Sequence, residues 1–304
     1  MHLHNAPFRR FRGSHVVAMF DTPGEFLDRL ATMTGKTITQ AEMRADRKSR
    51  FYSGETWSQI QARAVEGDAE TAKRAAAVMS QIARVPYETP KRKRVASPYG
   101  RVSVGAYLAS DPMPCRRHVK QASPHAPLSI VVSLNSIASV EADSLEKRGV
   151  AIAALVRRLT TERPVNLYLS RFSTIGDVAT CLLVKFPTTP LDSHRLAYLL
   201  SSQGFARGAG FAFHRSGAEL YAAAGAGAVK DVSKSSFITF AGTDSYSQTR
   251  NCNYASDLKE LLKTDLLYIP GSDPAHKEFR QMVNNPVAWL NETMSELTSK
   301  ATPR

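Results

Sequence analysis

The spacing of apolar residues changes near residue 128. Before this point, helical spacing recurs in three stretches, at residues 23–34, 57–66 and 68–82. After it, mostly apolar runs that alternate with helical stretches predict five strands, at residues 129–134, 165–172, 177–186, 237–240 and 266–269. The pattern therefore predicts an α/β sheet domain over residues 128–304, preceded by a mainly helical region over residues 1–127.

Two of the predicted strands, 165–172 and 177–186, are separated by only the four residues Ser173–Gly176. A parallel pair needs a crossover of a dozen or more residues, so these two strands must form an antiparallel hairpin. A doubly wound sheet ordinarily places a helix between successive strands. The order of elements therefore resembles a von Willebrand A-type sheet, which is mostly parallel and carries one antiparallel edge strand at this place. A generic Rossmann-like sheet is the alternative.

The segment Val131–Val140, VVSLNSIASV, lies where a von Willebrand A-type domain has a metal-binding D-x-S-x-S loop, and Ser133 takes the place of the aspartate. A divalent cation prefers carboxylate oxygens, and this segment offers only neutral ones, so we expect no metal. The residue types predict a strand end followed by a helix start. The alternative is a crevice at the carboxyl ends of the strands, lined by Ser133, Asn135, Ser136 and Ser139.

Basic residues are concentrated in the first 127 residues, which contain 21 Lys+Arg against 11 Asp+Glu, a formal charge of +10 out of +13 for the chain. They form three clusters: Arg9, Arg10 and Arg12; Lys91, Arg92, Lys93 and Arg94; and Arg116, Arg117 and Lys120. Such cations neutralise phosphates, and Phe8, Phe11 or Tyr99 could stack on a base. A nucleic acid, DNA or RNA, is therefore the expected partner. An acidic protein and a simple solvated loop are the alternatives.

Several other classes of protein are disfavoured by the sequence. The three cysteines, Cys115, Cys181 and Cys252, are far apart and form no C-x-x-C, which argues against a disulfide framework and a zinc ribbon. Gly35-Lys36-Thr37 matches the end of a phosphate-binding loop, but Leu30 stands where its first glycine belongs. No apolar run has the length of a membrane helix. We therefore expect no membrane partner. No catalytic constellation can be assembled from the residues either, so we expect no cofactor.

Several short motifs resemble a family of uncharacterised proteins from tailed bacteriophages and prophages, known only as a domain of unknown function. The matching segments are Phe51–Trp57, Glu66-Gly67, Ala72–Arg74, Tyr107–Met113, Val131–Val140, Arg148–Ala151 and Leu267–Gly271. The resemblance implies a phage origin, and hence the cytoplasm of a bacterial host or, for a packaged protein, the virion. It implies no reaction and no catalytic residue.

The sequence therefore predicts a non-enzymatic bacteriophage accessory or assembly protein that binds nucleic acid through its basic N-terminal region. A metal-free protein–protein interaction module of von Willebrand A type is one alternative. A phosphoryl-transfer enzyme or nuclease is the other, and it would need clustered carboxylates around a metal ion.

Overall fold

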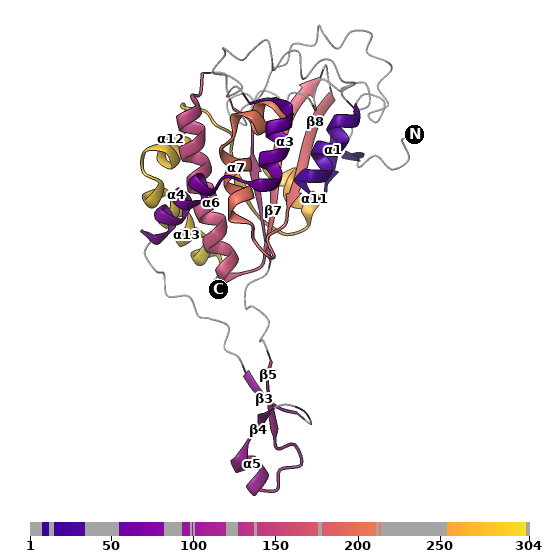
Figure 1. The fold of residues 1–304 in the computed structure, drawn as a ribbon, viewed down its shortest axis with the longest axis vertical. Helices are drawn as coiled ribbons and strands as arrows, with labels where there is room; N and C mark the ends of the chain where they lie inside the picture. The colour runs from indigo at the N-terminus through magenta and orange to yellow at the C-terminus, as the bar shows by residue number, and fades with distance from the viewer. Residues whose placement is uncertain are drawn as a thin grey trace.

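The computed structural model of the chain describes residues 8–11, 15–33, 55–81, 93–97, 99, 101–119, 127–136, 139–175, 178–210, 213 and 254–301. These residues form a six-stranded sheet covered by helices, and a separate three-stranded sheet (Figure 1). Within these ranges, no helix combines the length and the apolar character that crossing a membrane requires.

The larger sheet has the strand order β1-β2-β8-β7-β6-β9. Its strands are β1 (Phe8–Phe11), β2 (His15–Phe20), β6 (Leu128–Ser133), β7 (Val165–Ile175), β8 (Val178–Phe186) and β9 (Asp265–Ile269). The five strands from β2 to β9 form three parallel pairs and one antiparallel pair, β7–β8. Strand β1 runs antiparallel to β2 at the edge. The described chain is thus a mixed α/β fold with a mostly parallel sheet, which confirms the coarse prediction.

Strands β7 and β8 form the hairpin that the short connection predicted. Their pairing runs from Ile175 opposite Val178 to Leu167 opposite Phe186. Strand β8 is not at the edge of the sheet, however, because β2 pairs parallel to its other side. The antiparallel edge strand expected of a von Willebrand A-type sheet is therefore an interior strand here. The predicted strand at residues 237–240 lies outside the described residues.

Helices pack on both faces of this sheet, and the side chains of β6 contribute to a separate hydrophobic core on each face. Ile130 and Val132 belong to the larger core, which includes side chains of α1, α3, α4, α6, α7 and α13. Val131 belongs to a smaller core on the other face, where Leu258 of α11 packs. Because all of β6 is buried, its apolar run is continuous rather than alternating. The helices are α1 (Pro23–Met33), α3 (Trp57–Glu66), α4 (Ala69–Ser80), α6 (Ala142–Glu162), α7 (Ser193–Ser201), the π-helix η2 (Gly204–Ala209), α11 (Tyr254–Leu262), α12 (Lys277–Asn284) and α13 (Pro286–Ala301).

The N-terminal segments share the sheet and the core of the rest of the chain. Strands β1 and β2 extend the sheet beyond β8. Phe26 of α1, Ile60 of α3 and Ala75 of α4 pack in the larger core with residues of α6 and α7. The expected boundary at residue 127 therefore does not divide two hydrophobic cores. The apolar pattern did not show this because β1 and β2 are short and their partner strand is distant in the sequence.

The part of the chain that contains the second and third basic clusters builds the second sheet. Its elements are β3 (Lys93–Ser97), β4 (Arg101–Val102), the short helix α5 (Val104–Leu108) and β5 (Cys115–Val119), with strand order β3-β5-β4. The prediction of a mainly helical region over residues 1–127 does not describe this part of the chain, where three strands surround one short helix. Pro112 and Pro114 lie just before β5, where proline limits a strand without preventing it.

Candidate nucleic-acid interface

The three-stranded sheet brings together two of the predicted basic clusters. Strand β5 lies between β3 and β4 and is antiparallel to both. Its register sets Arg94 opposite His118, and Arg117 opposite Val95. The valines of these strands favour extended backbone. Two clusters that are separate in the sequence are therefore neighbours across a single strand pair.

Four of the predicted cations have described positions on these strands: Lys93, Arg94, Arg116 and Arg117. Four others lie outside the described residues: Arg12, Lys91, Arg92 and Lys120. Arg101, which the sequence did not single out, lies on β4 opposite Arg116. The signal that could have identified it was its place between two basic clusters, but only the strand pairing makes it part of the same sheet.

Like charges are placed directly opposite one another in this sheet. The register pairs Arg101 with Arg116. Neighbouring strands are about 4.8 Å apart, and like charges directly opposite destabilise a strand pair. The three strands contain no Asp or Glu that would offset the repulsion. The sheet therefore carries an electrostatic cost that an anionic partner would relieve.

The first basic cluster belongs to a different part of the fold. Arg9 and Arg10 lie on β1, opposite Val17 and Val16 of β2. In the described part of the chain, β1 is one of the two edge strands of the larger sheet. The three clusters thus do not meet in one described surface: two share the second sheet, and the first lies on the edge of the larger one.

Most of the candidate crevice residues at the end of β6 are buried. Ser133, Asn135 and Ser136 are no more than 6% exposed, whereas Ser139 is exposed. The Asn135 side-chain amide donates to the Phe172 carbonyl at 2.7 Å, and its oxygen accepts from the Phe172 backbone amide at 2.9 Å. Asn135 therefore extends the β6–β7 pairing beyond the end of the strand, as a peptide group would. This arrangement favours the strand-end interpretation over a ligand crevice. Within the described residues, no group of three or more His, Cys, Asp or Glu is placed to hold a metal ion.

Arg148 of α6 joins the ends of two strands, a role that the sequence did not reveal. Its buried guanidinium donates to the carbonyl of Ser133 at 2.9 Å and to the carbonyl of Pro270, just after β9. Burial lowers the pKa of Arg148 to about 10, and the nearby charge of Glu278 opposes this shift. The side chain is therefore still cationic at neutral pH. Its hydrogen bonds to the two carbonyls explain why an arginine stands within the Arg148–Ala151 motif.

Two further buried arginines lie near the same strand end. Arg207 of η2 donates to the Ser136 hydroxyl and to the Val140 carbonyl, each at 3.0 Å. Arg171 of β7 donates to the Ala206 carbonyl. Arginine ordinarily indicates a surface position, so no sequence pattern identified these side chains as buried. They attach η2 to the loop after β6 and to β7.

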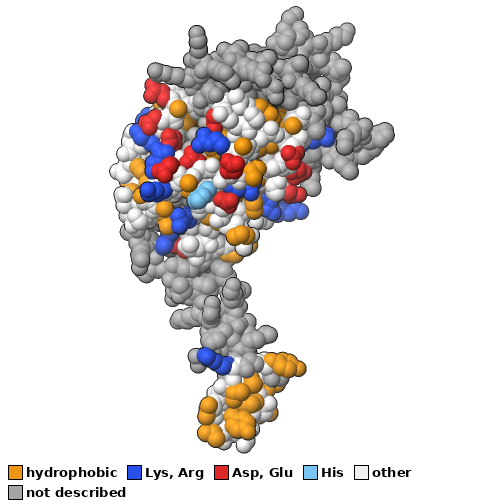
Figure 2. All heavy atoms as spheres, viewed as in Figure 1, with side chains coloured by type: hydrophobic (Ala, Val, Ile, Leu, Met, Phe, Trp, Pro, Cys, Tyr) orange, Lys and Arg blue, Asp and Glu red, His pale blue; other side chains and the backbone are white. Residues whose placement is uncertain are grey.

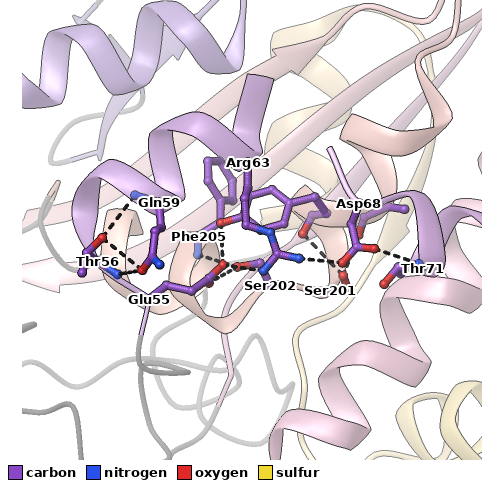
Figure 3. Close-up of polar contacts among 11 residues, drawn as sticks. Glu55, Thr56, Gln59, Arg63, Asp68, Thr71, Ser201, Ser202 and Phe205 are labelled. Atoms are coloured by element: carbon purple, nitrogen blue, oxygen red, sulfur yellow. Dashed lines mark hydrogen bonds and ion pairs between the residues drawn. The ribbon is translucent and has the colours of Figure 1, made fainter. Parts of the chain in front are cut away.

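A polar network centred on Arg63 joins α3, α4 and α7 (Figure 3). Arg63 forms ion pairs with Glu55 at 2.9 Å and with Asp68 at 2.8 Å, and it lies 5.0 Å from the centre of the Tyr198 ring. Glu55 also accepts hydrogen bonds from the Tyr198 hydroxyl at 3.2 Å and the Ser202 hydroxyl at 3.0 Å. Burial, reinforced by the charge of Glu55, raises the pKa of Tyr198, so its hydroxyl stays protonated as a donor. These contacts hold α3, α4 and α7 together.

The neighbouring motif residues also have structural roles. Thr56 begins α3 with a capping box, in which its hydroxyl accepts from the Gln59 amide at 3.3 Å and the Gln59 side chain accepts from the Thr56 amide at 2.8 Å. Gly67 ends that helix with a φ of 83°, and a Cβ there would lie 2.3 Å from the His194 carbonyl carbon. Only glycine fits this close approach. Helix capping and close packing therefore explain why these residues stand in the motif.

The described residues define a mixed α/β protein with a main six-stranded sheet and a separate three-stranded sheet that is rich in basic residues. A family model described as a domain of unknown function (DUF7192) matches residues 5–270, and the chain belongs to this family. The matched residues include every described strand of both sheets and end before the helices α12 and α13. No curated protein and no solved structure matches the chain.

Proposed function

We propose that the chain is a non-enzymatic protein that binds nucleic acid through its three-stranded sheet. The observation that carries the proposal is the register of this sheet, which pairs the second and third basic clusters and adds Arg101. Five Lys or Arg residues lie on its strands, and no Asp or Glu does. A polyanion would offset the repulsion between these positions, and its phosphates would release counterions on binding.

The proposed origin and relationship of the protein rest on the sequence motifs. We propose that the protein is an accessory or assembly protein of a bacteriophage that acts in the cytoplasm of the bacterial host or in the virion. The order β8-β7-β6-β9, with its single antiparallel pair, supports a von Willebrand A-like relationship. The interior position of β8 departs from that pattern and leaves the Rossmann-like alternative open.

Salt dependence of binding tests the proposed function. Fluorescence anisotropy would measure the affinity for labelled duplex and single-stranded DNA and RNA over a range of salt concentrations. The variant R94Q/R116Q/R117Q removes three cations of the sheet, which should reduce the slope of log affinity against log salt by about 0.9 for each phosphate contact that is lost. The control K73Q/K185Q/K277Q removes the same charge from exposed positions on α4, β8 and α12.

Three outcomes would contradict the proposal. Absence of binding by the wild-type protein at low salt would overturn it directly. Equal slopes for the two triple variants would show that only net charge matters and that the sheet is not the interface. The same preparations, incubated with nucleic acid and Mg²⁺ or Mn²⁺, would test the nuclease alternative, because turnover under those conditions would replace the binding proposal with an enzymatic one.

A further inference from the structure

One end of the three-stranded sheet carries an exposed apolar surface. Seven large hydrophobic side chains are exposed in the described part of the chain, and six of them fall within residues 99–113: Tyr99, Val102, Val104, Tyr107, Leu108 and Met113. Figure 2 shows hydrophobic side chains gathered over this end of the sheet, which we call the apolar tip. Single exposed apolar residues are ordinary, but a contiguous group marks a contact surface.

The apolar tip is held in shape by its own backbone. Helix α5 lies in the middle of it, and the Tyr107 amide donates to the Ser103 carbonyl at 2.9 Å. The Ser103 amide donates to the Pro114 carbonyl at 2.8 Å, which ties the start of the tip to its end. The Asp111 amide donates to the Ala106 carbonyl at 2.9 Å. A preformed surface loses less conformational entropy on binding, so the tip is suited to contact a partner.

The cationic positions run along the strands of the sheet, and the apolar tip extends from one end of it. Because β3 and β5 are antiparallel, Lys93 pairs with Val119 at one end, and Ser97 pairs with Cys115 at the other. The residues of the tip follow Ser97 and precede Cys115 in the sequence, so the tip extends from that second end. The cationic positions of β3 and β5 line the strands behind it.

We propose that the apolar tip inserts between base pairs of duplex DNA while the cations of the sheet contact the flanking phosphates. This inference rests on the proposed nucleic-acid binding and names its substrate and its mode. Proteins that kink DNA insert side chains such as leucine and methionine between base steps, and the bent duplex then contacts more of the protein. Leu108 and Met113 are side chains of this kind, and both are exposed.

The composition of the tip favours a duplex over a single strand. Single strands are bound mainly by stacking of bases on aromatic rings. Only Tyr99 and Tyr107 of the six exposed tip side chains are aromatic, and the others are valine, leucine and methionine. A lipid surface is a weaker fit, because helices that lie in a membrane interface present a long apolar face and α5 has only five residues.

DNA bending tests this insertion of the apolar tip, which we call the wedge. A short duplex with a fluorescent donor and acceptor at its two ends reports bending, and 2-aminopurine within the duplex reports unstacking. The wild-type protein should bend the duplex by about 20–90° and raise the 2-aminopurine fluorescence. The variant V104S/L108S should lose both signals and keep the salt slope of binding. The control V65S alters Val65 of α3, which is the only exposed large hydrophobic side chain outside the tip among the described residues, and should behave as the wild type.

The outcomes separate the two proposals. If the wild-type protein does not bind DNA, both the proposed function and the wedge are overturned. Binding without bending, or equal bending by V104S/L108S, overturns the wedge alone. Phosphatidylserine vesicles are included as a second probe: if V104S/L108S lost vesicle binding while its DNA bending was unchanged, the tip would be a lipid contact and the wedge would be wrong.

Discussion

Replacing Asn135 with alanine distinguishes a loop that supports the sheet from a loop that lines a ligand site. The Asn135 side chain is fully buried and makes hydrogen bonds of 2.7 and 2.9 Å with the backbone of Phe172. Each buried group that loses its partner costs about 1–3 kcal/mol. N135A should therefore lower the free energy of unfolding by about 2–5 kcal/mol, which is a large fraction of the stability of an ordinary domain.

Urea denaturation followed by tryptophan fluorescence measures this change, because Trp289 is buried and Trp57 packs against the same core. The matched control is Ser139→Ala, which alters an exposed position of the same loop and should change the free energy of unfolding by less than about 0.5 kcal/mol. Equal stability of N135A and S139A would refute the structural role of the amide and make the loop a candidate ligand site again.

Three further predictions concern packing, pH and thiol reactivity. A Cβ on Gly149 of α6 would lie 2.7 Å from the Leu200 carbonyl oxygen, so G149A should destabilise the protein by about 1–3 kcal/mol in thermal unfolding; G105A, with nothing within 4 Å of the added Cβ, should not. Burial raises the pKa of Glu278 above its ordinary value of 4.5, so the folded state holds this proton more tightly than the unfolded state. The stability of the wild type relative to E278Q should therefore fall as the pH rises from about 4 to about 7, and a constant difference would contradict this reasoning. Burial also raises the pKa of the Cys181 thiol, so peptide mass spectrometry should find this cysteine alkylated only after unfolding; alkylation in the native protein would show that the thiol is accessible.

Local signals predicted the parts of the fold that neighbouring residues determine. The four-residue connection Ser173–Gly176 required a hairpin, and β7 and β8 form one. A helix was expected over residues 68–82, and α4 follows Asp68, whose carboxylate accepts from the Thr71 amide at 3.0 Å. The apolar run at residues 129–134 predicted a strand buried on both faces, as β6 is. In each case the physical constraint lies within a few residues of the feature.

Features that depend on distant residues were not predicted. The pairing of β3 with β5 unites two basic clusters, but neither segment has a period that specifies its partner. Strand β2 is too short to be identified without β8, its neighbour in the sheet. The burial of Arg148 and Arg171 depends on backbone carbonyls supplied by other elements. The apolar tip was not predicted for the same reason, because the exposure of its side chains depends on the fold.

The position of β2 has a consequence for the synthesis of the chain on the ribosome. Strand β2 ends at Phe20, whereas its parallel partner β8 begins only at Val178. The N-terminal strands therefore leave the ribosome long before the strand that receives them, and an unpaired strand edge readily pairs with other chains. A fragment that began at residue 128 would lack β2, so the edge of β8 that pairs with β2 would be unpaired. Either half expressed alone should therefore aggregate more readily than the whole chain.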